Sequence, residues 1–127
     1  MQFNLDNNIP IYIQLVEQLK KYIISGKIKP GEKLPSVREL ALQTKVNPNT
    51  MQKALVELEE LKLIYTERTN GKYVTEDKEQ INKLKYEYAK EISQNYIISM
   101  LDIGFNLNET IKYLKDEKGD NNGNINM

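Results

Sequence analysis

The sequence predicts a mainly α-helical protein that carries one small β-hairpin. Three observations support this fold class. Apolar residues recur at steps of three or four along most of the chain, which is the spacing of one helix face. Serine, asparagine and proline stand where several of these stretches begin, as is typical of helix N-termini. An Asn-Gly pair at positions 70 and 71 separates two β-prone runs.

A first helix is predicted over residues 10–25. Pro10 falls near its first turn, where the missing amide hydrogen is harmless. Gly26 supplies a stop, and the following "KPGEKLP" is typical of a turn. The residues that recur at helical spacing are Tyr12, Leu15, Val16, Leu19 and Ile23.

A second, short helix is predicted over residues 36–44. Ser36 can cap it, and Glu39 stands three residues later, which is the spacing of a capping box. One side of this helix is apolar and carries Val37, Leu40 and Ala41.

A third helix follows over residues 47–61, with Asn47 as its cap and Pro48 in its first turn. Its apolar stripe consists of Met51, Ala54, Leu55, Leu58 and Leu61. The helix opens with more short polar side chains than a cap needs, and nothing charged appears until Lys53. These extra polar residues predict a contact surface.

Two β-prone pieces, "LIYTER" and "KYVT", come next and are joined by Thr69, Asn70 and Gly71. Because asparagine and glycine both tolerate positive φ, the pair predicts a hairpin. The second and third helices with their short connection then form a helix-turn-helix, and the hairpin forms a wing. Recognition helices commonly meet base edges with their N-terminal residues. The candidates for such contacts are Asn47, Asn49, Thr50 and Gln52.

From residue 76 on, the chain is predicted to be helical, with a break at Gly104 and a short last helix that an asparagine and Glu109 cap. The two helices have more apolar surface than they can cover with each other. We expect this surface to form a homodimer, although docking on the chain's own first helix stays open. The candidate dimerisation residues are Ile92, Tyr96, Ile97, Met100, Leu101 and Phe105.

The predicted organisation is a winged helix-turn-helix over residues 1–75, a helical dimerisation segment over 76–118 and a disordered tail over 119–127. Charge divides in the same way. Residues 1–75 hold 11 basic against 8 acidic residues, giving +3, and residues 76–127 hold 7 against 10, giving −3. The net charge of zero argues mildly against a nucleic-acid partner, but the basic excess in the first part permits one.

The stretch from Ile9 to Val74 resembles the GntR family of bacterial transcription regulators. The matching segments are "PIYIQLVEQLKKYIISGKIKPGEKLPSVRELA", "VNPNTMQKALVELEELKLIYTER" and "GKYV". The resemblance implies a winged helix-turn-helix that binds a double-stranded DNA operator as a dimer. The short segment after the hairpin resembles the YtrA subfamily, which is often linked to ABC-transporter genes. That segment leaves little room for a ligand pocket, so no effector is named.

By motif position, Arg38 matches an arginine of the family that contacts bases or phosphates. Asn47, Asn49, Thr50, Gln52 and Lys53 fall at recognition-helix contacts, and Gly71 falls at the wing tip. The chain departs from the family in two places. Lys62 stands where a glycine is usual, so the third helix needs another stop, and the wing reads "TNGK" in place of Gly-Lys-Gly-Thr.

Within this reading, Lys45, Lys53, Lys72 and Ser36 are candidate phosphate partners, which would make binding depend on salt. Asn70, Gly71 and Lys72 form the candidate wing contacts. Plainer readings stay open for several residues. Arg38 could pair with Glu39 or Glu60, Asn47 could serve only as a cap, and Gln52 and Lys53 could be solvated helix surface.

Other classes of protein are less well supported. The chain has no histidine or cysteine, so it lacks the commonest general base, the thiolate nucleophile and typical zinc ligands. We therefore expect no enzyme activity, no cofactor and no metal. No segment is apolar enough to span a membrane and no secretory signal opens the chain, so a cytoplasmic location is expected. A winged-helix adaptor that binds protein instead of DNA stays open as the alternative.

Overall fold

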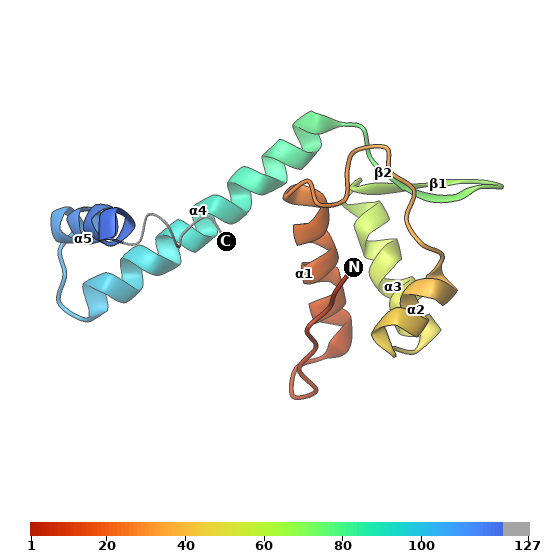
Figure 1. Ribbon diagram of the computed structural model, residues 1–127, viewed down its shortest axis with the longest axis horizontal. Helices are drawn as coiled ribbons and strands as arrows, with labels where there is room; N and C mark the ends of the chain where they lie inside the picture. The colour runs from red at the N-terminus through yellow and green to blue at the C-terminus, as the bar shows by residue number, and fades with distance from the viewer. Residues whose placement is uncertain (121–127) are drawn as a thin grey trace. The chain divides into compact units, whose positions relative to one another are not determined.

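The computed structural model describes residues 1–120, and the side chains of residues 1–117. Over these residues it contains five helices and one antiparallel hairpin, which confirms the predicted fold class (Figure 1). The elements are α1 (Ile11–Ile24), α2 (Val37–Thr44), α3 (Pro48–Glu60), β1 (Ile64–Glu67), β2 (Gly71–Val74), α4 (Lys78–Asp102) and α5 (Leu107–Asp120). The chain divides into two compact units, of which the first is Met1–Lys85 and the second begins at Tyr86.

α2 and α3 form the predicted helix-turn-helix, and each begins at a side-chain cap. The Ser36 hydroxyl accepts a hydrogen bond from the Glu39 amide, and the Glu39 carboxylate accepts one from the Ser36 amide, both at 3.1 Å. The hydrogen bond from the Ser36 amide, followed by the Ser36 side chain, holds the pKa of the Glu39 carboxylate below its usual value. The Asn47 side chain accepts a hydrogen bond from the Asn49 amide at 2.8 Å. Both predicted caps are therefore confirmed.

Two lysines end these helices in the left-handed conformation that glycine usually supplies. Lys45 follows α2 with φ 57°, and Lys62 follows the C-cap of α3 with φ 60°. After Lys62, the Leu63 amide donates to the Leu58 carbonyl at 3.0 Å, which is the long hydrogen bond of a Schellman motif. α3 thus has its stop without the glycine that the family usually carries there.

The hairpin loop differs from the prediction. The two strands pair with Glu67 opposite Gly71, so the loop consists of residues 68–70 and Gly71 belongs to β2. The Asn70 amide donates to the Glu67 carbonyl at 3.2 Å. Of the predicted Asn-Gly pair, Gly71 alone has a positive φ, at 115°. The chain has adopted a three-residue loop that a glycine closes, which is a common alternative to the two-residue turn.

The segment that precedes α2 runs along the second edge of β2. The Leu34 amide donates to the Lys72 carbonyl at 2.8 Å, and the Val74 amide donates to the Glu32 carbonyl at 2.9 Å. β2 is therefore hydrogen-bonded on both edges, to β1 and to this segment. The wing is fastened to the first unit along its whole second strand.

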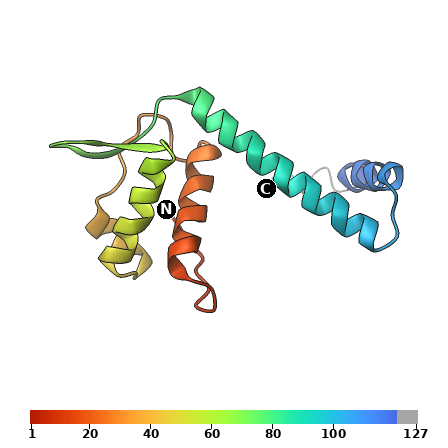
Figure 2. The ribbon, with the colours of Figure 1, turned by 180° about the vertical axis from the view of Figure 1, so that it is seen from behind.

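The core of the first unit lies between α1, α3 and the hairpin. α1 packs along α3 in both views of the ribbon (Figures 1 and 2). The Tyr12 hydroxyl of α1 donates to the Glu57 carboxylate of α3 at 2.8 Å, which raises the pKa of Tyr12. Burial follows the predicted stripes, and the fully buried large side chains are Leu15, Leu19, Ile23, Leu40, Met51, Leu55, Leu58, Leu63 and Val74.

Residues 2–6 form an arm against α1 that the sequence patterns do not predict. Gln14 and Gln18 stand one helical turn apart, and their side-chain amides pair with the backbone of this arm. Gln18 accepts from the Asn4 amide at 3.1 Å and donates to its carbonyl at 2.6 Å. Gln14 makes the same two hydrogen bonds to Asp6, each at 2.7 Å. The backbone of an extended segment usually finds its hydrogen-bond partners in a neighbouring strand, and here the glutamine side chains of α1 supply them.

The first turns of α4 belong to the first unit. Asp77 caps this helix by accepting a hydrogen bond from the Gln80 amide at 3.1 Å. Ile81 is buried and Leu84 is half-buried against the core. The compact unit therefore extends to Lys85, beyond the predicted boundary after residue 75, because apolar residues of α4 pack on the core.

The second unit consists of the remainder of α4 and of α5. Met100 and Thr110 are buried, and Asn106 and Glu109 form a capping box with hydrogen bonds of 2.8 and 3.0 Å at the start of α5. α5 runs to Asp120, so the predicted tail over residues 119–127 begins within a helix. Its last part, residues 121–127, lies outside the described residues.

Candidate nucleic-acid interface

The predicted DNA contacts lie on α2, on the turn after it, on α3 and on the hairpin, all within the first unit. Their exposure separates them into two groups. Thr50 and Lys72 are half-buried. The exposed residues are Ser36, Arg38, Lys45, Asn47, Asn49, Gln52, Lys53, Asn70 and Gly71. Most of the predicted set is therefore accessible to a partner.

The start of α3 presents short polar groups on its outer side. Asn49, Gln52 and Lys53 are exposed, whereas Met51 between them is buried in the core. The Asn47 side-chain oxygen is engaged in the cap, which leaves its NH₂ group as a donor. The exposed side-chain amides of Asn49 and Gln52 can donate and accept at once, which is the chemistry that reads an adenine edge. Burial of the apolar stripe of α3 fixes the orientation of the helix about its axis, and in this orientation the polar side chains at its start face outward.

Arg38 is exposed in the first turn of α2 and is available to a partner. Within the part of the chain that the structure describes, it forms no ion pair, so the pairing with Glu39 or Glu60 is not observed. Glu39 is engaged in the capping box with Ser36. A guanidinium in this state has five donors in a fixed plane, which suits bidentate bonding to guanine or to phosphate.

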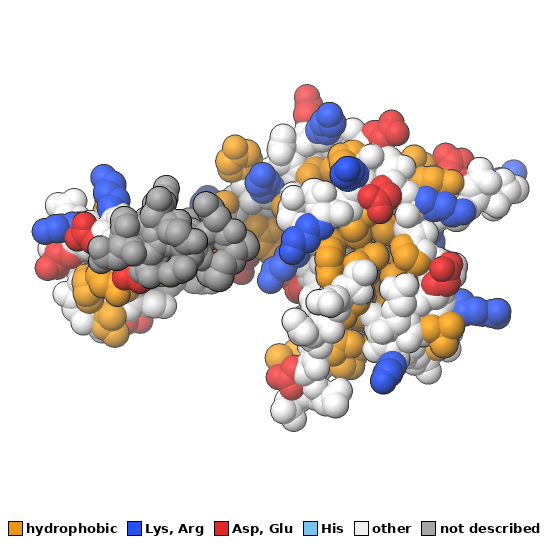
Figure 3. Space-filling view, viewed as in Figure 1, with side chains coloured by type: hydrophobic (Ala, Val, Ile, Leu, Met, Phe, Trp, Pro, Cys, Tyr) orange, Lys and Arg blue, Asp and Glu red, His pale blue; other side chains and the backbone are white. Residues whose placement is uncertain are grey.

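A groove of about 370 Å³ opens between the start of α2 and the wing. Ser36 lines it from α2, and Lys33 lines it from the preceding segment. Arg68, Asn70 and Gly71 line it from the wing. Lysine and arginine side chains lie over the wing and α2 in the space-filling view (Figure 3). Lys72 also lines the groove, which therefore brings four of the predicted contacts next to two basic residues that the sequence did not single out.

Those two basic residues are Lys33 and Arg68, both exposed. The sequence pattern predicts Arg68 to be a strand residue, but the observed register places it in the hairpin loop. The Lys33 side chain lies against Gly71, where an added β-carbon would stand 3.2 Å from its Cε. The sequence could have indicated Arg68 as a candidate contact, because it is a basic residue next to the predicted hairpin loop and side chains of such a loop project from the end of a wing. The contact of Lys33 depends on strand pairing and has no local signal.

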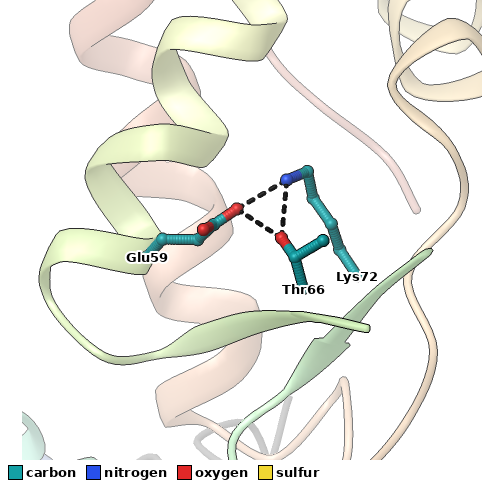
Figure 4. Close-up of polar contacts among 3 residues, drawn as sticks. All are labelled: Glu59, Thr66 and Lys72. Atoms are coloured by element: carbon teal, nitrogen blue, oxygen red, sulfur yellow. Dashed lines mark hydrogen bonds and ion pairs between the residues drawn. The ribbon is translucent and has the colours of Figure 1, made fainter. Parts of the chain in front are cut away.

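Lys72 lies in β2, within the predicted β-prone piece, and its ammonium has partners within the chain. Its ammonium donates to the Glu59 carboxylate at 2.5 Å and to the Thr66 hydroxyl at 3.0 Å (Figure 4). The Thr66 hydroxyl in turn donates to Glu59 at 2.8 Å. The hydrogen bond from Lys72 is the main cause that lowers the pKa of Glu59. The prediction of a phosphate contact assumed a free lysine, and the structure shows one that is already engaged.

The described residues show no basis for a metal centre or a membrane span. No group of three potential ligands among His, Cys, Asp and Glu occurs in residues that the structure describes. None of the described helices combines the length and apolar character that crossing a bilayer requires.

The candidate dimerisation residues are unequally accessible. Ile92 and Leu101 are exposed, at 63% and 48% of their surface. Tyr96, Ile97 and Phe105 are half-buried, and Met100 is buried. Figure 3 shows apolar side chains beside the α4–α5 turn. Further exposed apolar residues on these helices, which the prediction omitted, are Ile98, Ile103, Leu107, Ile111, Tyr113 and Leu114.

Comparison with protein families gives a match over the first unit. The family model described as "Bacterial regulatory proteins, gntR family" matches residues 11–74. This range contains α1, the helix-turn-helix and the hairpin.

Comparison with individual proteins extends the likeness to nearly the full chain. The HTH-type transcriptional repressor YtrA of Bacillus subtilis (strain 168) is 37% identical over 124 residues, which are 97% of this chain and 95% of that protein. A solved GntR family transcriptional regulator from Listeria monocytogenes is 44% identical with a TM-score of 0.82, covering 88% of this chain and 98% of that one.

Some of the similar structures contain DNA. The DNA-binding domain of AraR in complex with operator ORE1 is 32% identical to this chain and has a TM-score of 0.51. The match covers 59% of this chain and 94% of that one.

Proposed function

Since the chain belongs to the gntR family of bacterial regulatory proteins, we propose that it is a sequence-specific transcriptional repressor. It binds a palindromic operator as a homodimer through α2, α3 and the wing. The resemblance to the YtrA subfamily favours a transporter operon as its target. Operator binding places the protein in the cytoplasm with the bacterial chromosome.

One observation carries this proposal. The first turns of α3 expose Asn49, Gln52 and Lys53 around a buried Met51, directly after a capped turn. A helix-turn-helix that docks in a major groove presents this part of its second helix to the bases. The similarity of 59% of the chain to a DNA-binding domain solved with its operator supports the assignment.

Binding begins with the phosphates. Lys45 and Lys53 are exposed on the turn and on α3, and each phosphate that they neutralise releases counterions. Such contacts set register without reading sequence. Lys33 and Arg68 add positive charge on the wing side of the groove. Affinity is therefore expected to fall steeply as salt rises.

Sequence choice rests on fewer groups. Arg38 is exposed and unpaired within the described residues, so it can donate two hydrogen bonds to one guanine. Asn49 and Gln52 can each pair with adenine through the side-chain amide. Each such pair is worth about 1–3 kcal/mol of discrimination against the wrong base. Thr50, which is half-buried, is placed at the edge of this surface.

The apolar surface of the second unit supports the homodimer. Within that unit, Ile92, Ile98 and Ile103 are each more than half exposed, and soluble monomers rarely display such runs. A second copy offers an identical surface, which is the usual way that a two-fold dimer is built. Two copies of the wing and of α3 then require two half-sites, which makes the operator a palindrome.

A salt-dependent gel shift with the protein's own promoter, followed by footprinting, tests the proposal. The expected result is a protected palindrome whose affinity falls as salt rises, and much weaker binding to the scrambled sequence. Equal affinity for both sequences would contradict the regulator. The complete absence of DNA binding, combined with capture of a protein partner, would support the adaptor instead.

A further inference from the structure

We propose that Lys72 is a positioning residue, which holds the wing against α3 through Glu59, and that it does not contact a DNA phosphate. The inference rests on the proposed DNA-binding function, since it concerns how the wing is presented to the operator. It reverses the role that charge and motif position predict for this lysine.

The geometry joins three elements through one carboxylate oxygen. Glu59 lies in the last turn of α3, Thr66 lies in β1 and Lys72 lies opposite Thr66 in β2. The Glu59 oxygen accepts from the Lys72 ammonium at 2.5 Å and from the Thr66 hydroxyl at 2.8 Å (Figure 4). The ammonium also donates to Thr66 at 3.0 Å, which closes a triangle. Both strands of the wing are thereby tied to the recognition helix.

Burial opposes a move of Lys72 to a phosphate. Its side chain is only 16% exposed, and that of Glu59 is 33% exposed. If the ammonium left, the partly buried Glu59 carboxylate would lose its countercharge and keep the Thr66 hydroxyl as its donor. Glu59 would also repel the incoming phosphate. The exposed Lys53 has no such partner to leave, because it forms no ion pair with a described residue.

The hairpin needs an anchor of this kind. A two-stranded hairpin is marginal by itself, and here each strand has four residues. The alternation of side chains places Thr66 and Lys72 on the face toward Glu59, and the Tyr65 and Tyr73 rings stack together as the neighbouring cross-strand pair. The segment before α2 holds one edge of β2 through backbone hydrogen bonds. The contacts of Glu59 then restrict movement of the wing face relative to α3.

An exchange of the two charges tests the proposal on the full-length protein and its footprinted operator. Lys72→Glu alone is expected to lower operator affinity by about tenfold, because Glu59 and the new carboxylate repel. The double variant Glu59→Lys with Lys72→Glu restores the pair and is expected to return affinity to within about threefold of the wild type. The matched control, Glu60→Lys with Lys72→Glu, has the same net charge without the pair and is not expected to recover. A phosphate contact would leave both double variants weak, and that result overturns the proposal.

The salt dependence of binding supplies a second criterion. Lys72→Met keeps the length of the side chain and removes its charge. The slope of log affinity against log salt is expected to stay unchanged in this variant, because the lysine neutralises no phosphate. A decrease of the slope by about 0.9 would show a phosphate contact and overturn the proposal.

Limited proteolysis measures the anchor without DNA. Trypsin cleaves after Arg68 in the wing loop, and Lys72→Met is expected to speed this cleavage about fivefold because the hairpin opens more often. The charge exchange is expected to restore the wild-type rate. An unchanged rate in Lys72→Met would contradict the anchor. If the wild type bound no operator, the proposed function would fail, whereas the cleavage rates would still decide the role of Lys72 in the wing.

Discussion

The side-chain amide of Gln80 donates a hydrogen bond to the backbone carbonyl of Leu61 at 2.9 Å. Leu61 is the C-cap of α3, and Gln80 lies in the first turn of α4. The C-terminal carbonyls of a helix have no partner within the helix, so an acceptor of this kind needs an external donor. The end of the proposed recognition helix is therefore held by the first residues beyond the wing.

Replacement of Gln80 by alanine is expected to destabilise the first unit by about 1 kcal/mol, because the Leu61 carbonyl loses its donor. Urea unfolding at equilibrium measures the change. Asn82→Ala, at an exposed position two residues further along α4, is the matched control and is expected to leave the unfolding midpoint nearly unchanged. Equal losses in the two variants would show that the hydrogen bond is unimportant.

Lys62→Gly is expected to stabilise the protein by about 1 kcal/mol. Lys62 has φ 60°, a conformation that costs a residue with a β-carbon and that glycine adopts freely. Lys62→Ala keeps the β-carbon and is the control, which should show no comparable gain. Thermal and urea unfolding measure both variants. A glycine variant less stable than the alanine variant would indicate that the lysine side chain itself stabilises this helix end.

The Glu59–Lys72 pair predicts a pH dependence of stability. The hydrogen bond from Lys72 lowers the pKa of Glu59 below 4.5, so the stabilisation is present above that pH and is lost as pH falls through the lowered value. The difference in unfolding free energy between the wild type and Glu59→Gln should therefore shrink below about pH 4.5. In a Lys72→Met background the same difference should vanish or reverse, because burial then raises the pKa of Glu59. A difference that stays constant down to pH 3 in the wild-type background would contradict the pair.

Arg38→Ala is expected to weaken binding to the operator by about 1–3 kcal/mol and to relax specificity at one base pair, while the fold stays intact. Fluorescence anisotropy with the operator and a scrambled duplex measures both effects. Lys53→Ala is the comparison, which should weaken binding to both duplexes and lower the salt slope by about one. An Arg38→Ala effect of equal size on both duplexes would assign this arginine to phosphate alone.

Ile92→Asp is expected to convert the proposed dimer into a monomer. Ile92 is 63% exposed on α4, and a carboxylate there would be buried against the proposed second copy. Sedimentation velocity gives the state of association. Gln94→Asp adds the same charge at an exposed position on the same helix and should leave the dimer intact. An Ile92→Asp variant that still sediments as a dimer would place the interface elsewhere.

The sequence predicted the features that local chemistry decides. Ser36 with Glu39 and Asn47 with Pro48 are short patterns whose hydrogen bonds form between neighbours in the chain, and the structure has them at the expected positions. The stripes of α1 and α3 were also predictable, because a periodic set of apolar residues has one way to be buried. These two helices together fix which polar side chains the start of α3 exposes.

The features that sequence reasoning missed depend on partners far apart in the chain or on competing turns. The pairing of Glu59 with Lys72 requires the register of the hairpin, and that register depends on whether the loop spans residues 68–70 or 69–71. The Asn-Gly pair favours the loop over residues 69–71, but the pairing of β2 with the segment before α2 stabilises the loop over residues 68–70. Lys62 likewise takes a backbone conformation that its side chain disfavours, because the Schellman hydrogen bonds compensate.

The hold of Gln14 and Gln18 on residues 4 and 6 has an evolutionary and practical consequence. At residues 4 and 6 both glutamines hydrogen-bond backbone amide and carbonyl atoms, so these hydrogen bonds do not depend on the side chains at the two positions. Almost any amino acid could stand at 4 or 6 without loosening them. Proline is the exception, since it lacks the hydrogen that each glutamine oxygen receives. Random libraries at these two sites should accordingly reject proline most strongly, and at position 6 they should favour residues that can replace the Asp6 carboxylate as acceptor for the Asn8 amide.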